Sequence, residues 1–448
     1  MSRALALYPG LPIVGVLPAF IRDRLALFGR VRAHCGDLGG FRLPGQTVAL
    51  VSSAQGAREA LLEKSEAFEK SPILRRLARP ILGDGIVACK NASHRRQRRL
   101  LAPAFTPRQL ASYADRMVES TRLHQLDWQD GARIELVDEM TRLTLRIVGQ
   151  ALFSVDFLAE ARPLAQAVET AIRHIGSLVT QPLRAPLWVQ TPANRRINAA
   201  VRFLDQTMLR MIHERRAGAS PPNDLLTSLV QARDDETNTQ LSDREVRDEV
   251  MNLFAAGHET TAVGLSWTFH LLMRHPAAAE RLRAEAVGVL AGRAARHEDF
   301  ERLPYALAVF KEAMRLYPPI HSISRSAAQD VEILGTHIPR GTIVTVSPLL
   351  MHHRGDYFSE PDAFQPERFL GAAEKSIDRY AYIPFGAGPR SCIGSQFSLL
   401  EATLVVATLA QQVRFEPVDS EPVPAEALFS LRPGLPVAAI VRRQPAPS

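Results

Sequence analysis

Cys392 lies in the segment FGAGPRSCIG, where three glycines, a proline and an arginine surround a single thiol. Gly386, Gly388 and Gly394 allow a tight turn and let a flat group approach the backbone closely. A helix is predicted to begin just after Gly394, and a helix N-terminus favours negative charge, so the turn could hold Cys392 as a thiolate. The segment therefore indicates either an inert buried thiol or a thiolate presented to a metal ion.

A second group of polar residues interrupts an apolar helical pattern at AAGHETTA, residues 255–262. Gly257 costs about 1 kcal/mol relative to alanine inside a helix, and Glu259 is costly in apolar surroundings unless it is paired or neutral. Thr260 can bond back to the carbonyl four residues earlier and bend the helix. Two interpretations stay open. The first is close helix packing beside a satisfied polar patch, and the second is an opening for a small ligand, where Glu259 and Thr260 relay protons. A zinc-hydrolase HExxH motif is excluded, because no histidine follows His258 at the fourth position.

Glutamate and arginine three residues apart mark another predicted helix, in KEAMRLYPP. Glu312 and Arg315 would share one face of that helix and could pair, and Arg368 in the loop QPERFL could reach Glu312. A surface ion pair is the simpler interpretation, but the apolar run around the motif favours a buried pair. His352 and His353 are neighbours in the chain and cannot point the same way, so we interpret them as structural or solvent-facing.

Basic residues are concentrated in HRRQRR, residues 94–99. Helical spacing places His94 and Arg98 on one face, while Arg325 and Arg390 occur singly in predicted loops. Three interpretations apply to these cations. They could form a solvated basic face or a nucleic-acid patch, although the run lacks the aromatic residues on which bases stack. They could also clamp the carboxylates of a bound cofactor.

One long helix is needed to position the AAGHETTA segment. Residues 242–275 predict it, because Ser242 and Glu245 form a capping-box pattern and His275 followed by proline ends the helix. From Met251 onward the helix is apolar on nearly every face, so that part should be buried. We expect it to run through the middle of the molecule.

The remaining patterns predict a mainly α fold with a small β portion. Turn signals and apolar runs indicate strands over 37–53 and again over 328–348, and helical patterns dominate about 54–317. A last helix is predicted over about 395–413. With no repeat and no flexible linker, we expect one domain over 1–448.

Composition restricts the possible partners and the compartment. The 448-residue chain carries a net charge of +7, which by itself establishes no nucleic-acid partner. Its three cysteines, Cys35, Cys89 and Cys392, form no CxxC pair, which excludes zinc ribbons and cysteine-ligated iron–sulfur clusters and favours a reducing cytosol. The apolar N-terminus is broken by prolines and is too short to span a bilayer. We therefore expect a cytoplasmic protein with no membrane span.

Taken in their order, the motifs resemble those of the cytochrome P-450 superfamily of haem-thiolate monooxygenases over nearly the whole chain. FGAGPRSCIG is similar to the haem-binding loop, AAGHETT to the oxygen-activating helix, KEAMR to the ExxR element and PERF to its partner. The resemblance implies the cytochrome P-450 fold, with haem b between a long central helix and the cysteine loop. A single cysteine suffices, because haem iron takes one axial thiolate.

The resemblance also implies a role for each matching residue. Glu259 and Thr260 would be the catalytic acid–alcohol pair, and Glu312, Arg315 and Arg368 a structural triad. The family carries a tryptophan where this chain has His94, whose ring can still donate a hydrogen bond. The residues expected to hold the haem are Cys392 as the axial ligand, Phe385 and Gly394 in the loop around it, and His94, Arg98, Arg325 and Arg390 at the propionates.

The substrate pocket implied by analogy is mostly aliphatic, which fits a hydrophobic small molecule such as a terpene, fatty acid or steroid-like compound. Besides parts of 73–88 and 175–190, its expected lining is Leu253, Phe254, Ala256, Gly257, Ile320, Ile323 and Phe429. The implied reaction inserts one atom of O2. Electrons from NAD(P)H would arrive through a separate ferredoxin and ferredoxin reductase, attracted by a basic face that includes some of Arg95, Arg96 and Arg99. We expect a monomer.

Three other functions stay open at this point. The first is a peroxide-driven or non-oxidative haem-thiolate enzyme, which the presence of Glu259 and Thr260 disfavours. The second is a non-catalytic haem-binding or sensor protein. The third is a basic nucleic-acid binder, which would account for the arginines and leave the ordered motifs unexplained.

Overall fold

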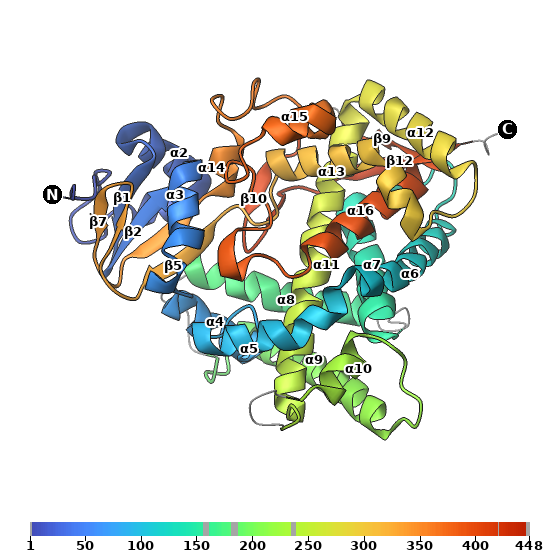
Figure 1. The fold of residues 1–448 in the computed structure, drawn as a ribbon, viewed down its shortest axis with the longest axis horizontal. Coiled ribbons are helices and arrows are strands. Elements are labelled where there is room, and N and C mark those ends of the chain that lie inside the picture. Colours follow the sequence, from blue (N-terminus) through green and yellow to red (C-terminus); the bar gives the residue numbers. More distant parts are fainter. Residues whose placement is uncertain (1, 156–160, 181–186, 234–238, 420, 445–448) are drawn as a thin grey trace.

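The computed structural model describes residues 2–155, 161–180, 187–233, 239–419 and 421–444. A large helical body carries a smaller β-rich part at one end (Figure 1). The predicted mainly α fold with a small β portion is therefore correct. Among the described residues, none of the helices combines the length and the apolar character that crossing a bilayer requires.

The helices follow one another along most of the chain. In chain order, the α-helices of the described residues are α1 (Leu17–Arg22), α2 (Arg24–Cys35), α3 (Ala54–Arg58), α4 (Pro72–Leu82), α5 (Asn91–Leu101), α6 (Pro107–Gln125), α7 (Leu136–Val148), α8 (Ala161–Thr180), α9 (Pro192–Ala217), α10 (Leu225–Gln231), α11 (Asp243–Arg274), α12 (Pro276–Leu290), α13 (Pro304–Leu316), α14 (Pro348–His352), α15 (Gly371–Ser376) and α16 (Ser395–Ala410). The last helix ends slightly before the predicted boundary, and a strand follows it.

The β portion is built from short strands brought together from both ends of the chain. They are β1 (Leu38–Leu43), β2 (Gln46–Val51), β3 (Phe68–Glu69), β4 (Arg133–Glu135), β5 (Ile323–Ala327), β6 (Val331–Ile333), β7 (Thr336–Ile338), β8 (Ile343–Val346), β9 (Val413–Pro417), β10 (Ala425–Ala427), β11 (Leu431–Pro433) and β12 (Ala438–Arg443). The largest sheet has the order β1-β2-β8-β5-β3. The predicted hairpin over 37–53 is present as β1 and β2, with Leu38 opposite Val51.

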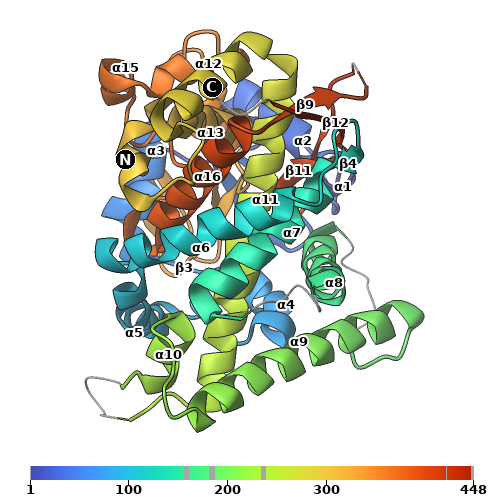
Figure 2. The same cartoon turned by 90° about the vertical axis from the view of Figure 1, so that its right-hand side faces the viewer.

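Helix α11 runs through the middle of the molecule in both views (Figures 1 and 2). Its N-terminus shows the expected capping box, in which Ser242 and Glu245 each bond to the other's backbone N–H, and it ends one residue before His275. Burial begins earlier than the apolar pattern predicted. Arg247 and Glu249, in the charged first turns, are both buried, because α4 and the loop that follows it lie against them.

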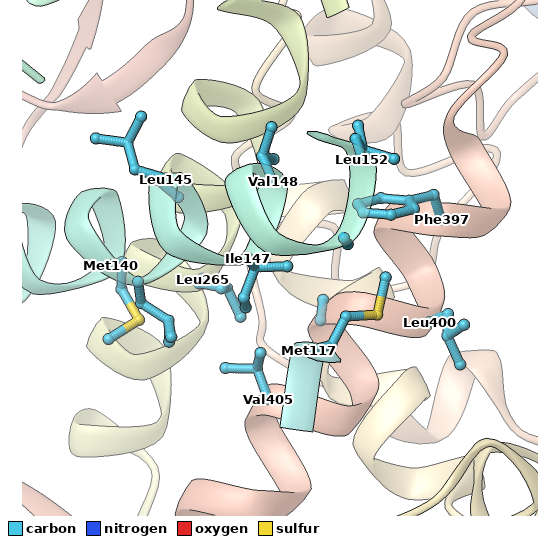
Figure 3. Close-up of a cluster of buried hydrophobic side chains, with 14 of the residues drawn as sticks. Met117, Met140, Leu145, Ile147, Val148, Leu152, Leu265, Phe397, Leu400 and Val405 are labelled. Atoms are coloured by element: carbon cyan, nitrogen blue, oxygen red, sulfur yellow. The ribbon is translucent and has the colours of Figure 1, made fainter. Parts of the chain in front are cut away.

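The core beside α11 is formed by side chains from α6, α7, α11 and α16 that point toward one another (Figure 3). It includes Met117, Met140, Leu265 and Val405, each essentially inaccessible to solvent. The close helix contact considered for Gly257 is found instead at Gly264, where an added Cβ would lie 2.9 Å from the Phe310 ring. At Gly257 the nearest atom would be at an ordinary 3.5 Å. Gly257 therefore does not serve close packing.

Candidate haem-binding and catalytic site

The cysteine loop is held in one shape by its own backbone. The Cys392 amide donates to the Phe385 carbonyl at 2.9 Å, and the Ser391 amide donates to the Gly388 carbonyl at 3.0 Å. Gly388 has φ +72°, and a Cβ there would lie 1.8 Å from the Leu61 carbonyl oxygen. Only glycine fits at this position, because both the backbone conformation and the contact exclude a side chain. The loop leads directly into α16, so Cys392 lies at the N-terminus of a long helix.

The Cys392 thiol is accessible to solvent, yet it lies among many protein atoms. Desolvation by the surrounding protein is the main cause that raises its pKa, opposed by the Gly394 amide and the charge of Arg98. We infer from this combination that the thiol borders a space enclosed by protein, which is called the hollow below. No group of three or more His, Cys, Asp or Glu side chains in the described part of the chain could hold a metal ion. The candidate ligand is therefore a single thiolate.

The wall opposite the cysteine loop comes from α11. Within this buried helix, the partly accessible residues are Ala255, Ala256, Gly257, Glu259 and Thr260, whereas Phe254 before them and Thr261 after them are buried. The hydroxyl of the next residue, Thr261, lies 3.3 Å from that of Ser398 on α16. This contact joins the AAGHETTA turn of α11 to the helix that follows Cys392.

Three further pocket residues predicted from the sequence share this partial accessibility. They are Ile320, Ile323 and Phe429, and a Cβ on Gly386 of the cysteine loop would lie 3.4 Å from the Ile323 side chain. The stretch expected from 175–190 lies largely outside the residues whose side chains the structure describes.

Leu253 and Phe254 behave differently from the other predicted pocket residues. Both are buried, and Phe254 has no accessible surface. The Phe254 ring packs against Phe153 at 6.4 Å and against His258 at 5.3 Å between ring centroids. The structure thus places Phe254 in the core, because a helix turns by about 100° per residue and the accessible face of α11 begins at Ala255.

The acid–alcohol pair is split between two sets of contacts. The Thr260 hydroxyl donates to the Ala256 carbonyl at 2.8 Å, the back-bond expected from the sequence. Glu259 turns toward the loop between β10 and β11, where its Oε1 accepts a hydrogen bond of 2.8 Å from Ser430. Burial raises the Glu259 pKa to about 7, and the Ser430 hydrogen bond and the charge of Arg432 oppose that rise. A carboxyl with such a pKa can both hold and release a proton near neutrality.

Cations from distant parts of the chain gather at one side of the hollow. His94, Arg325 and Arg390 line a depression of about 50 Å³, and Arg98 donates to the Ser391 carbonyl at 2.7 Å. Lys70 joins them, which the sequence analysis missed. It follows β3, whose pairing with β5 puts Glu69 opposite Ser326 and brings Lys70 beside Arg325.

This cluster carries positive charge without enough negative charge to match it. Burial, then Arg325 and Arg390, lower the Lys70 pKa to about 7. Burial and the four neighbouring cations lower the His94 pKa to about 4. Arg390 donates to Asn91 and to the Cys89 carbonyl, while its Nη1 is buried without a hydrogen-bond partner among the described residues. Such a set of donors fits a bound group that carries two carboxylates, as haem b does.

Glu312, Arg315 and Arg368 meet beside the cysteine loop. Arg315 Nε and Nη2 donate to the two Glu312 oxygens at 2.7 and 2.8 Å, and Arg368 Nε lies 3.4 Å from Glu312 Oε1. The Glu312 and Arg315 side chains have no exposed surface. Arg315 also donates to the carbonyl of His352 at 2.8 Å. The triad therefore ties α13 to the chain between the end of α14 and the start of α15.

His352 has a structural position that the sequence left open. It is fully buried, and its Nε2 accepts a hydrogen bond of 3.1 Å from the Ile383 amide, just before the cysteine loop. Its carbonyl accepts from Arg315. His352 thus links the triad to the loop that carries Cys392. His353 lies nearer the surface, with Asp362 at 2.9 Å.

Comparison with known proteins agrees with this geometry. The family model for Cytochrome P450 matches residues 6–437. The chain belongs to the cytochrome P450 family. A cyclooctatin synthase from Streptomyces melanosporofaciens is 36% identical, with 95% of this chain and 93% of that protein covered. A pentalenene oxygenase from Streptomyces avermitilis is 35% identical, with 95% of each covered.

The P450 fold is also found among solved structures. The crystal structure of the cytochrome P450DA heme domain superposes with a TM-score of 0.89 at 27% identity, covering 100% of this chain and 98% of that one. A third relative, a cyclooctat-9-en-7-ol 5-monooxygenase from Streptomyces melanosporofaciens, is 35% identical over 92% of this chain and 89% of its own. This P450 is a haem-dependent monooxygenase, as the sequence resemblance implied.

Proposed function

We propose that this P450 hydroxylates a terpene, with electrons supplied by a separate ferredoxin and its reductase. The observation that carries the site assignment is the cation cluster around a hollow faced by one thiol, with Arg390 Nη1 buried and unpartnered among the described residues. Cys392 is the proposed axial ligand of haem b. Arg98, Arg325, Arg390 and Lys70 are the proposed partners of its carboxylates, with His94 as a neutral donor.

The haem, once bound, supplies activation of O2 and insertion of one oxygen atom. The protein's part is to supply protons and to exclude bulk water. Glu259 is the proposed proton donor, because a pKa of about 7 lets its carboxylate take up a new proton from solvent near neutral pH. Thr260 is the next residue on the accessible face of α11. Its hydroxyl is the proposed alcohol that passes the proton from Glu259 into the hollow.

The proposed substrate class rests on the pocket and on the relatives. The proposed lining residues Ala256, Gly257, Ile320, Ile323 and Phe429 carry no polar side chain, so a hydrocarbon skeleton would be bound by burial of its surface. Two of the relatives are named for cyclooctat-9-en-7-ol and pentalenene. A terpene fits both observations better than a fatty acid, whose carboxylate would need a cation among these lining residues.

The redox partner proposal rests on charge. The chain has a net charge of +7, and Arg95 on α5 is exposed, with only a 3.5 Å contact to an exposed Glu66. Arg96 is less available, because it pairs with Glu245 at 3.1 Å. We therefore expect an acidic ferredoxin, with NAD(P)H as the distant electron source. Three free cysteines agree with a reducing cytoplasm.

Spectroscopy tests the thiolate assignment first. The reduced, CO-bound protein should show the strongly red-shifted Soret band of thiolate ligation, and Cys392→Ala should abolish it. Cys89→Ala is the matched control, because Cys89 is buried with its thiol beside a backbone carbonyl, and this variant should keep the band. A thiolate spectrum in Cys392→Ala would refute the ligand assignment.

Turnover then tests the reaction. Terpene hydrocarbons and alcohols should produce a low-to-high-spin shift, whereas fatty acids of similar carbon number should not. Product should form with NAD(P)H, ferredoxin and reductase. Equal product formation from peroxide alone would instead support the peroxide-driven alternative and remove the ferredoxin from the proposal.

A further inference from the structure

Glu259 is held by a residue far away in the sequence. Its Oε1 accepts the 2.8 Å hydrogen bond from Ser430, and its Oε2 is buried without a partner among the described residues. Ser430 is itself fully buried. The two carboxyl oxygens are therefore not equivalent: one is fixed by a hydroxyl, and the other is available to carry a proton.

The turn that carries Ser430 is fixed from several directions. Arg24 at the start of α2 donates to the carbonyls of Ala427 and Leu428. On the other side, Trp267 of α11 donates from Nε1 to the Leu431 carbonyl at 2.8 Å, and the Leu431 amide donates to the Pro319 carbonyl at 2.9 Å. Because these contacts fix the backbone on both sides of Ser430, the turn determines where the Glu259 carboxyl points.

Charged groups continue from this turn to the protein surface. Arg432 lies two residues beyond Ser430, in the middle of β11. Its Nη2 lies 3.4 Å from Glu169 Oε1 on α8, and the exposed fractions are 17% for the Arg432 side chain and 51% for that of Glu169. Glu169 also accepts from Arg173 at 2.8 Å. Arg432 and Glu169 are the charged groups that act on Glu259 electrostatically, and they act with opposite signs.

We infer that Ser430 is the positioning residue of the proton donor and that the Arg432–Glu169 pair marks the outer end of its proton-uptake route. The inference rests on the proposed role of Glu259. Ser430 fixes Oε1 and leaves Oε2 as the oxygen that binds and releases the proton. Each cycle moves one proton from solvent water to Glu259 Oε2 and one from Oε2 into the hollow, so the carboxyl returns to its starting state. No electron is transferred within this chain of residues.

The first measurement does not depend on turnover. Difference infrared spectroscopy on the resting holoenzyme, from about pH 5 to about pH 9, follows the carboxylic C=O band that disappears in Glu259→Gln. Ser430→Ala removes a donor to the charged form, so the band should persist to higher pH, with proton affinity raised about tenfold. Ser430→Thr should restore the wild-type midpoint. Ser266→Ala is the matched control, because Ser266 is an equally buried serine that donates only to a backbone carbonyl.

The outer pair gives predictions of opposite sign. Arg432→Gln removes a positive charge and should raise the midpoint pH of the Glu259 infrared titration. Glu169→Gln removes a negative charge and should lower that midpoint pH. A global loss of structure would not move the two midpoints in opposite directions. An unchanged midpoint in Ser430→Ala, or shifts of the same sign in the outer variants, overturns the inference.

Coupling of NAD(P)H oxidation to product separates this inference from the proposed function. Ser430→Ala should shift the pH profile of coupling upward together with the infrared midpoint, and Ser430→Thr should restore it. If Glu259→Gln is fully coupled, the proposed donor role fails, whatever Ser430 does to the infrared band. If Glu259→Gln is uncoupled while Ser430→Ala matches the wild type in both measurements, only the positioning role fails.

Discussion

Arg315→Ala should be among the most destabilising single changes in this protein. Arg315 has no exposed surface and donates to both oxygens of Glu312. It also donates to the carbonyls of His352, Pro361 and Ala363 at 2.8, 2.6 and 3.0 Å. The alanine variant leaves a buried carboxylate without its main partner and three carbonyls without this donor. Removing one member of a buried pair costs about 4 kcal/mol.

The chain supplies its own matched control. Glu119 and Arg122 have the same three-residue spacing, but their oxygen and nitrogen lie 3.6 Å apart and both side chains are about half exposed. Arg122→Ala should cost less than about 1 kcal/mol. Guanidinium unfolding of both variants, followed by circular dichroism, measures the difference. Comparable losses in the two variants would refute the argument from burial.

A double-mutant cycle separates the ion pair from the carbonyl contacts. Glu312→Leu with Arg315→Leu removes both charges, so the double variant should lose at least about 2 kcal/mol less than the sum of the two single variants. Additive losses would mean that the ion pair between Glu312 and Arg315 contributes nothing to the free energy of unfolding. In that case the guanidinium would act only by holding the three carbonyls.

The remaining predictions concern the cysteine loop, the loop after α4 and the proton donor. Gly388→Ala should lower the haem-to-protein ratio and the melting temperature. The control is Gly335→Ala, because Gly335 has a similar φ of +70° and no atom lies near an added Cβ. This control should lose only about 1 kcal/mol of stability through backbone strain. Asn252→Ala removes hydrogen bonds from α11 to the backbone on both sides of the loop after α4 and should make that loop cleavable by limited proteolysis, with a loss of about 2 kcal/mol. The Glu259 pKa is about 7 in the folded protein and about 4.5 in an ordinary solvated glutamate. The unfolded state therefore ionises first, and the wild-type free energy of unfolding falls by about 3 kcal/mol between about pH 4.5 and pH 7. Unfolding at several pH values should show that Glu259→Gln lacks this decline, and an identical decline would contradict the raised pKa.

Local signals explain what the sequence predicted well. The bounds of α11 follow from Ser242, Glu245 and the proline after His275, which act within a few residues. The contact between Glu312 and Arg315 follows from helical spacing, and the burial of that pair from the apolar residues around it. The hairpin of β1 and β2 follows from the turn signal of Gly45, where φ is +70°.

Long-range contacts explain what the sequence did not reveal. Lys70 reaches the cation cluster because a two-residue strand, β3, pairs with β5 more than 250 residues later. No sequence pattern near Lys70 predicts that pairing. The bond between Ser430 and Glu259 spans 171 residues. Glu249, in a charged turn, is buried because it accepts from the Ile86 amide at 3.1 Å. In each case the partner is chosen by tertiary packing, which residue spacing does not encode.

The basic run HRRQRR shows how one segment serves two surfaces. His94 and Arg98 are four residues apart and share the inner face of α5, where His94 is buried among the cations at the hollow and Arg98 holds the cysteine loop. Arg95 and Arg96 point elsewhere and pair with Glu66 and Glu245. Of the inner pair, Arg98 carries the charge and meets no acid among the described residues, which is costly in a folded protein unless a bound anion completes the site. The outer pair needs no such partner. The helical period alone therefore separates the residues that point to a cofactor from the arginines that face the protein surface.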